Sequence, residues 1–349
     1  MKRLCVIALS VALATACMKM TGIDVEPIGS TSRGLFITCE GNFMYGNASL
    51  SYYDMETRKV ENRVFRRANG ADLGDVAQSM TIYDGRGYVV VNNSGIVFVI
   101  DPDTFVVTAT IEGLTSPRYI HFVSPQKGYI TDLYDPRIAI FDPRTNAVTG
   151  YIDTGSHPST EQMVQWGDYV FTNCWSYDNK ILVIDTRTDT VVDQIEVGIQ
   201  PTSLVLDCND KLWSITDGGY AASPYGHEAP SLYRIDPATR RVERRFTFAE
   251  GDSPSELAIS GDGSRIYFIN DDIWQMEVTA ENLPARPLVA NVGTIYYGLA
   301  VDPATGDVYV ADAIDYQQPG VVYRYSAAGE AIDRFEVGII PGAFCFKSL

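Results

Sequence analysis

The chain has 349 residues, of which 46% are hydrophobic and 20% are charged, so it holds enough apolar material for a core and is not a disordered chain. The 27 Lys and Arg residues stand against 44 Asp and Glu residues, which gives a formal net charge of −17. This acidic balance excludes a nucleic-acid binder and a polybasic membrane-surface protein, because both need a basic surface.

The first residues are typical of a targeting segment. Lys2 and Arg3 precede a run of small and apolar residues, 4–16, which is too short to span a bilayer but suits a secretory signal. Cys17 follows small residues at the expected cleavage site, as in a bacterial lipobox; the alternative is an ordinary signal peptide followed by a chance cysteine. We therefore predict a lipoprotein signal peptide over 1–16 and a tether over 17–33 that begins at the lipidated Cys17.

The rest of the chain is a repeat. A strand-like run that ends in an aspartate and a tight turn occurs at 99–104 (VIDPDT), 140–145 (IFDPRT), 183–188 (VIDTRT) and 234–239 (RIDPAT), with a weaker copy at 52–57 (YYDMET). Asp and Pro favour such turns, because Asp accepts local backbone hydrogen bonds and Pro presets φ. A second type of run, first seen at 34–38, recurs seven times in all, with about 45 residues per copy. This period predicts an all-β fold over 34–349, a seven-bladed β-propeller of four-stranded antiparallel blades.

The two ends of the repeat predict how the ring closes. The first copy begins at its second strand, and the C-terminal residues 341–346 resemble the innermost strands of other copies. We therefore expect the C-terminal strand to complete blade one, which removes open sheet edges. Cys39 and Cys345 then lie on neighbouring strands, and a disulfide between them stays an open question. The remaining cysteines and the three histidines show no disulfide framework and no metal-ligand spacing.

The loops between second and third strands and the connectors between blades share one face, which we call the top face. These loops carry many aromatic and amide side chains, which offer rigid apolar surface and orienting hydrogen bonds. The alternative is that many of these aromatic residues pack between blades, and Tyr119 and Tyr297 are the strongest candidates for packing, because they lie near inner strands. The candidate ligand-binding residues are Asn42, Phe43, Tyr45, Asn93, Arg118, Tyr134, Glu161, Gln162, Trp175, Tyr177, Tyr220, Tyr225, His227, Tyr296, Tyr316 and Gln317.

Sequence motifs for catalysis are absent, including the nucleophile elbow, the P-loop and the zinc-protease motif. Only 4 Trp residues occur, without a blade-repeated pattern, which argues against a quinone cofactor. We therefore expect a protein that is not an enzyme. One alternative is a metal-dependent lactonase that uses Glu161, Glu256 and Asp271, and another is an adhesion or scaffold propeller without a small ligand.

The repeat resembles the YncE- and YVTN-type seven-bladed propellers. Longer stretches, among them 34–42 (GLFITCEGN), 116–121 (SPRYIH), 159–165 (STEQMVQ), 173–177 (NCWSY), 198–204 (GIQPTSL), 215–220 (ITDGGY), 311–317 (ADAIDYQ) and 338–345 (GIIPGAFC), resemble the cobalamin-capturing surface lipoproteins of Bacteroidetes, the BtuG type. Members of that family sit over an outer-membrane TonB-dependent cobalamin transporter and pass the vitamin to it.

The resemblance implies a non-enzymatic protein that binds cobalamin and related corrinoids as transported ligands, with no cofactor of its own. The implied partner is the TonB-dependent transporter, and the lipid anchor would be the only membrane contact. It further implies an outer-membrane location, exposed at the cell surface; because only scattered acids such as Asp24 and Glu26 follow Cys17, a periplasm-facing lipoprotein is the alternative.

Overall fold

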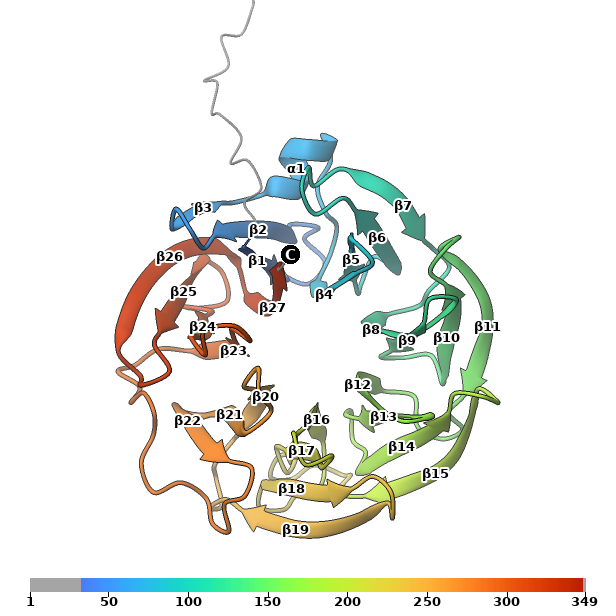
Figure 1. The fold of residues 1–349 in the computed structure, drawn as a ribbon, viewed down its shortest axis with the longest axis vertical. Coiled ribbons are helices and arrows are strands. Elements are labelled where there is room, and N and C mark those ends of the chain that lie inside the picture. The colour runs from blue at the N-terminus through green and yellow to red at the C-terminus, as the bar shows by residue number, and fades with distance from the viewer. Residues whose placement is uncertain (1–32, 348–349) are drawn as a thin grey trace, which may run out of the picture.

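The computed structural model describes residues 33–347, which form seven small antiparallel sheets arranged as a ring around a central axis (Figure 1). The predicted seven-bladed propeller is thereby confirmed. The predicted signal peptide, tether and Cys17 lie outside the described residues. No helix within 33–347 is both long enough and apolar enough to cross a membrane.

Each blade is named here by its order along the chain. Blade one contains β27 (Pro341–Lys347), β1 (Gly34–Cys39), β2 (Ser49–Asp54) and β3 (Lys59–Glu61). A short helix, α1 (Val64–Asn69), connects it to blade two, which contains β4 (Ala77–Tyr83), β5 (Arg86–Val91), β6 (Ile96–Ile100) and β7 (Val107–Ile111). Blade three contains β8 (Pro117–Ser124), β9 (Lys127–Asp132), β10 (Arg137–Asp142) and β11 (Ala147–Asp153), and blade four contains β12 (Thr160–Trp166), β13 (Tyr169–Cys174), β14 (Lys180–Asp185) and β15 (Thr190–Glu196).

The last three blades follow the same order from the axis outward. Blade five contains β16 (Pro201–Leu206), β17 (Leu212–Thr216), β18 (Ser231–Asp236) and β19 (Arg241–Thr247). Blade six contains β20 (Ser255–Ile259), β21 (Arg265–Asn270) and β22 (Asp272–Glu277), and blade seven contains β23 (Tyr296–Val301), β24 (Val308–Asp312), β25 (Pro319–Tyr325) and β26 (Ala331–Ile339). In blade six a single bridge between Ile273 and Val289 takes the place of a fourth strand.

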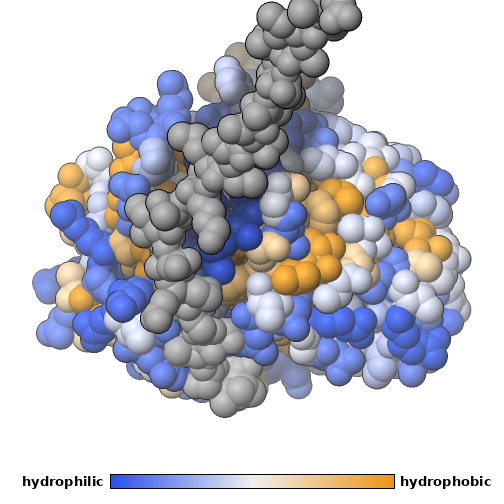
Figure 2. Space-filling view, turned by 90° about the horizontal axis from the view of Figure 1, so that it is seen from above, coloured by the Kyte–Doolittle hydropathy of each residue, from blue (hydrophilic) through white to orange (hydrophobic). Residues whose placement is uncertain are grey.

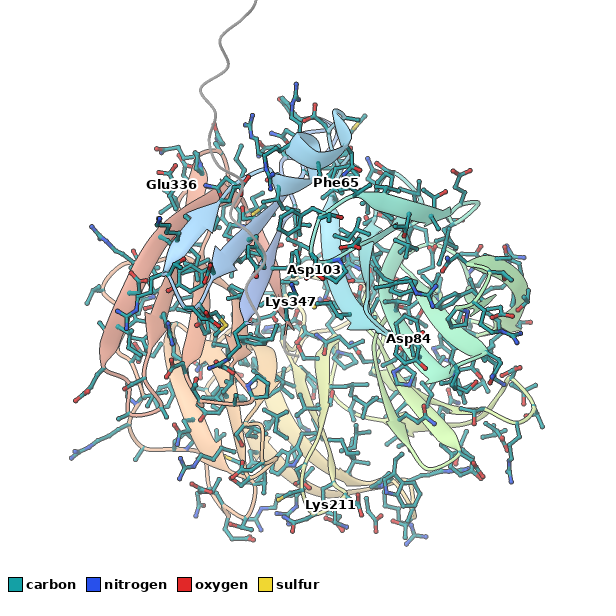
Figure 3. The ribbon with its side chains drawn as sticks, turned by 45° about the horizontal axis from the view of Figure 1, so that its top comes forward. Phe65, Asp84, Asp103, Lys211, Glu336 and Lys347 are labelled. Atoms are coloured by element: carbon teal, nitrogen blue, oxygen red, sulfur yellow. The ribbon has the colours of Figure 1, made fainter. Side chains whose placement is uncertain are left out.

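The C-terminal strand closes the ring as the sequence predicts. Strand β27 is the innermost strand of blade one and pairs antiparallel with β1, with Phe36 opposite Cys345. Lys347, at the end of β27, forms an ion pair with Asp103 in the turn between β6 and β7, and the two residues lie side by side in Figure 3. Blade one therefore combines the first and the last strands of the described chain, and the Lys347–Asp103 ion pair links it to blade two.

The recurring aspartates shape the turns between third and fourth strands. The Asp101 carboxylate accepts backbone N–H bonds from Asp103 and Thr104, at 2.8 and 2.9 Å. The other four recurring aspartates also accept a bond from the backbone N–H two residues further on; these are Asp54, Asp142, Asp185 and Asp236. A buried or half-buried carboxylate that satisfies local donors fixes each turn, which confirms the turn chemistry inferred from the repeat.

Apolar side chains fill the spaces between blades. The buried residues within 33–347 form seven hydrophobic clusters, one at each blade–blade interface. Aromatic rings dominate several of them; Tyr53 of blade one, for instance, contacts Tyr309 of blade seven with ring centroids 6.4 Å apart. The face seen in Figure 2 is largely hydrophilic, with hydrophobic patches between the polar side chains. Each blade is thus stabilised chiefly by its two neighbours, and the closed ring leaves no terminal blade without a partner.

The candidate disulfide between Cys39 and Cys345 is not formed, because both cysteines are free. They do lie on neighbouring strands, but Cys39 is opposite Pro341 and Cys345 is opposite Phe36. The two thiols also face different interfaces: Cys39 packs between blades one and seven, and Cys345 packs between blades one and two.

Candidate functional site

A cavity of about 1010 Å³ surrounds the propeller axis and opens on the top face. Its floor and walls come from the innermost strands of all seven blades, and its mouth comes from loops between second and third strands. Its volume lies at the upper end of the range for small-molecule sites, about 300–1,000 Å³. The cavity therefore has room for a large organic ligand.

A β-bulge lies at the same place in every innermost strand. Register shifts between the first and second strands of each blade follow Ala77, Pro117, Thr160, Pro201, Ser255 and Tyr296, and one lies opposite Gly342. A bulge leaves an extra residue outside the ladder and re-aims its side chain. The residues at these shifts line the cavity: Gln78, Arg118, Tyr119, Glu161, Gln162, Thr202, Glu256, Leu257, Tyr297 and Gly342. We call this set the bulge ring.

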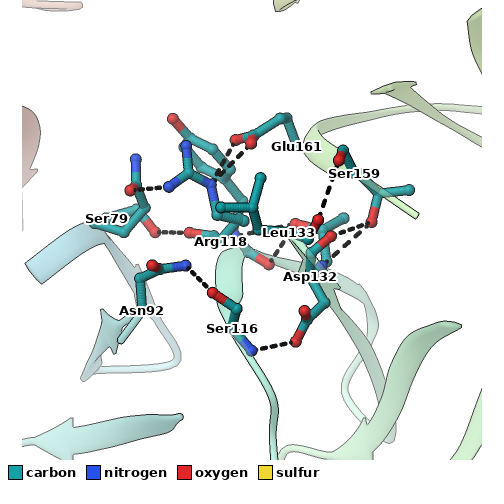
Figure 4. Close-up of polar contacts among 12 residues, drawn as sticks. Ser79, Asn92, Ser116, Arg118, Asp132, Leu133, Ser159 and Glu161 are labelled. Atoms are coloured by element: carbon teal, nitrogen blue, oxygen red, sulfur yellow. Dashed lines mark hydrogen bonds and ion pairs between the residues drawn. The ribbon is translucent and has the colours of Figure 1, made fainter. Parts of the chain in front are cut away.

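An ion pair crosses from blade three to blade four within the bulge ring (Figure 4). The Nε of Arg118 lies 2.8 Å from Oε1 and 2.9 Å from Oε2 of Glu161, and both side chains are largely buried. Arg118 also donates to the Gln78 side chain of blade two, and its carbonyl accepts from Ser79 at 2.7 Å. Burial raises the pKa of Glu161, while the Arg118 charge opposes that rise. The contacts fix both charged groups before any ligand binds.

Glu40 reaches the floor from the end of β1. Its carboxylate accepts a hydrogen bond from the Tyr297 hydroxyl, with 3.1 Å to Oε1. A Cβ at residue 342 would lie 2.6 Å from the same oxygen, so glycine at this position leaves the space that Glu40 occupies. Burial raises the pKa of Glu40 to about 7, and Arg118 opposes that rise. This carboxyl therefore holds its proton to a higher pH than a solvent-exposed glutamate does.

Glu256 supplies a third carboxyl group to the floor. Burial, together with the nearby Glu40 and Glu161 charges, raises its pKa to about 8. Together with Asp217 and Asp271 higher on the wall, five acidic residues and one basic residue line the cavity. The site is consequently electronegative wherever these acids are ionised.

Aromatic side chains form the walls between floor and mouth. The Trp175 indole hydrogen-bonds to Asp217, whose carboxylate also accepts from Gln200 at 3.1 Å and so holds the ring in place. On the opposite side, Tyr297 at the floor contacts Tyr316 at the mouth edge-to-face, with centroids 5.9 Å apart. Rigid rings with polar anchors suit the binding of a broad planar ligand.

The structure brings half of the predicted binding residues together. Those that line the cavity are Phe43, Arg118, Tyr134, Glu161, Gln162, Trp175, Tyr296 and Tyr316. The others lie on the top face outside it: Asn42, Tyr45, Asn93, Tyr177, Tyr220, Tyr225, His227 and Gln317.

The residues outside the cavity have local partners. Asn42 donates to the Tyr316 carbonyl at 2.5 Å and thereby joins two top loops, and Asn93 donates to Asp75 at 2.6 Å. Tyr177 and Tyr225 stack with ring centroids 4.4 Å apart. These contacts shape the rim, which we define as the exposed large hydrophobic side chains of the top loops: Phe43, Met44, Tyr45, Tyr134, Tyr177, Tyr220, Tyr225, Val292, Ile295 and Tyr316.

Tyr119 and Tyr297, the strongest candidates for packing between blades, both line the cavity. They occupy bulges, where the side chain turns from the ladder toward the axis. Glu40 and Gln78 are cavity residues that the sequence analysis missed. An alignment of the inner strands on Pro117, Pro201 and Pro341 would have marked the positions of the bulge ring.

The acids of the lactonase alternative do not gather as metal ligands. Glu161 is paired with Arg118, and Asp271 accepts a hydrogen bond from Asn291 at 3.1 Å. Within residues 33–347 the one group of three or more His, Cys, Asp or Glu side chains with ligand atoms within 4.8 Å is His157, Cys174 and Asp178. There the His157 ring already hydrogen-bonds to Asp178 at 2.6 Å.

The fold and the site together define a closed seven-bladed propeller with a preformed axial cavity. A family model described as "Domain of unknown function (DUF5074)" matches residues 33–346, so the chain belongs to this family. No curated protein matches it in sequence.

Solved structures share the fold at low sequence identity. A quinonprotein alcohol dehydrogenase-like protein from Bacteroides thetaiotaomicron has a TM-score of 0.68 and 16% identity, over 90% of this chain and 78% of that one. The computationally designed Ika8 protein has a TM-score of 0.61 and 13% identity, over 92% and 94%. The hydrazine synthase of Kuenenia stuttgartiensis has a TM-score of 0.59 and 16% identity, over 76% of this chain and 88% of that one. At these identities the likeness concerns the fold alone.

Proposed function

We propose that this protein captures cobalamin and related corrinoids in the axial cavity, leaves them chemically unaltered, and passes them to an outer-membrane TonB-dependent transporter. The observation that carries the proposal is the cavity itself, about 1010 Å³ in volume and lined by aromatic rings and side-chain amides. A corrinoid is a broad ring rimmed by carboxamides, so it needs both kinds of contact. The BtuG-type stretches of the sequence favour the same ligand.

The rigidity of the site supports high affinity. Arg118 and Glu161 bridge two blades, and the Trp175 ring is held by Asp217. Groups that are already ordered lose little conformational entropy on binding. A lipid anchor at Cys17 would hold the propeller at the outer membrane, where the transporter lies.

The rim supplies a surface for such a partner. Of the fourteen exposed large hydrophobic side chains within 33–347, ten belong to the rim and four lie on outer strands or a bottom turn. Exposed apolar residues gathered on one face are typical of interaction surfaces. Delivery from the cavity mouth would place this face against the transporter.

Calorimetry with a soluble form, residues 18–349, tests ligand capture. We expect cyanocobalamin to bind with 1:1 stoichiometry and to raise the melting temperature. Tyr151→Ala is a suitable control, because Tyr151 is an exposed tyrosine on the outer strand β11 and does not line the cavity. The proposal would be overturned if micromolar cyanocobalamin produced no heat of binding and no thermal shift. Binding of the loaded and empty protein to the purified transporter tests the transfer step.

A further inference from the structure

Glu256 differs from the other charged groups of the floor. Glu161 pairs with Arg118 and Glu40 accepts from Tyr297, whereas the Glu256 side chain has no hydrogen-bond or ion-pair partner within the described residues 33–347. It nevertheless lines the cavity, half-buried. A carboxyl group turned toward a cavity without a protein partner has its acceptor capacity available for a ligand.

The backbone holds Glu256 in this orientation at a cost. Its φ of +53° lies in the left-handed region that residues other than glycine seldom adopt. The register shift between Ser255 and Ala258 is the bulge that contains it. Strain of this kind is found where surrounding structure over-determines a functional conformation.

The surroundings of Glu256 determine which chemical group fits beside it. The ionisable groups that face it are the acids Glu40 and Glu161, the tyrosines Tyr119 and Tyr297, and the already paired Arg118. Asp217 and Asp271 add acids of the same sign higher on the wall. An anionic ligand group would meet repulsion here, whereas an N–H donor would find an open acceptor.

We propose that Glu256 determines ligand selectivity: its ionised carboxylate accepts a hydrogen bond from an uncharged amide N–H of the ligand and excludes ligands that carry a carboxylate at that position. This inference rests on the proposed function, because its ligand class is the carboxamide-rimmed corrinoids. It assigns the discrimination between a carboxamide and its hydrolysed acid to one residue of the floor.

The experiment compares cyanocobalamin with its b-, d- and e-monocarboxylic acids, each of which has one peripheral amide hydrolysed. Calorimetry is done at pH 8.5 with wild type, Glu256→Gln and the control Glu330→Gln, which lies in an exposed turn on the opposite face. We expect wild type and the control to bind at least one acid about tenfold or more weakly than cyanocobalamin. In Glu256→Gln that preference should fall to less than about threefold.

A second variant separates acceptor loss from charge loss. Glu256→Leu removes the acceptor and should weaken cyanocobalamin itself by about tenfold, with thermal melting to show that the variant is folded. Absence of cyanocobalamin binding to wild type would overturn the proposed function and this inference together. This inference alone would be overturned if wild type bound cyanocobalamin and all three acids with equal affinity. It would also be overturned if the preference for cyanocobalamin were unchanged in Glu256→Gln.

Discussion

The floor and the rim of the same cavity are built in opposite ways. The floor consists of polar and charged side chains on strand bulges, joined across blades by contacts such as the one between Arg118 and Glu161. The rim consists of exposed aromatic and aliphatic side chains on loops, such as Tyr134 and Tyr225, which are 70% and 61% exposed. Loops tolerate variation without loss of the fold, whereas the bulges belong to the sheets that form it. We therefore expect substitutions in the floor to affect both binding and stability, and substitutions in the rim to affect binding alone.

Removal of the Arg118 charge should have the largest effect on stability. Arg118→Met leaves the Glu161 carboxylate buried without its counterion, which costs about 3–5 kcal/mol of unfolding free energy. Urea denaturation monitored by tryptophan fluorescence measures it. The double variant Arg118→Met/Glu161→Leu should recover most of the loss, because replacing a buried ion pair by apolar residues is often nearly neutral. If the single and double variants were equally destabilised, the ion pair would not be the cause.

This contrast also explains what the sequence could predict. The repeated strand runs and the aspartate turns, such as the one at Asp142, are local patterns, so the number of blades and the closing strand could be predicted from the sequence alone. Rim aromatics were recognisable because they stand in loops of unusual composition. The floor was harder, because a bulge is defined by pairing between two strands; the sequence therefore makes Tyr119 and Tyr297 candidates for packing between blades. Glu40 lies outside the bulge ring altogether, and its carboxylate occupies the space beside Gly342 that a Cβ would enter.

Truncation of Trp175 should separate the cavity wall from the outer rim. Trp175→Ala removes a large anchored ring from the wall and should weaken cyanocobalamin binding by about 2–3 kcal/mol, a typical cost for a buried aromatic anchor. Tyr220→Ala, outside the cavity, should weaken it by less than about 1 kcal/mol. Calorimetry on both variants gives the comparison. Equal losses would place the ligand across the rim instead of within the cavity.

The raised pKa values of the floor predict that stability falls as pH rises. Glu40 and Glu256 keep their protons in the folded protein up to pKa values of about 7 and about 8, whereas an unfolded glutamate ionises near about 4.3. Between these values the unfolded state binds fewer protons than the folded state, so the free energy of unfolding decreases with pH.

Glu256→Gln isolates one contribution to this slope. The variant should match wild type at pH 3, where the carboxyl is protonated in both states, and exceed it by about 1–2 kcal/mol at pH 9, since water in the cavity reduces the cost of burying the charge. Urea denaturation across this pH range measures the difference, with Glu330→Gln as control. A difference that is constant with pH would show that ionisation of Glu256 is not responsible.

The smallest effect on stability is expected at the rim. Tyr177, Tyr220 and Tyr225 are all about half exposed or more, and the stacked pair Tyr177–Tyr225 belongs to none of the seven hydrophobic clusters within residues 33–347. The triple variant Tyr177→Ser/Tyr220→Ser/Tyr225→Ser should therefore have a melting temperature within about 2 °C of wild type, because substitutions at exposed sites usually change stability little. Its affinity for cyanocobalamin should fall only slightly, whereas binding to the transporter should weaken if the rim is the docking face. A large drop in melting temperature would mean that these rings support the blades beneath them, and the distinction between a structural floor and a dispensable rim would not hold.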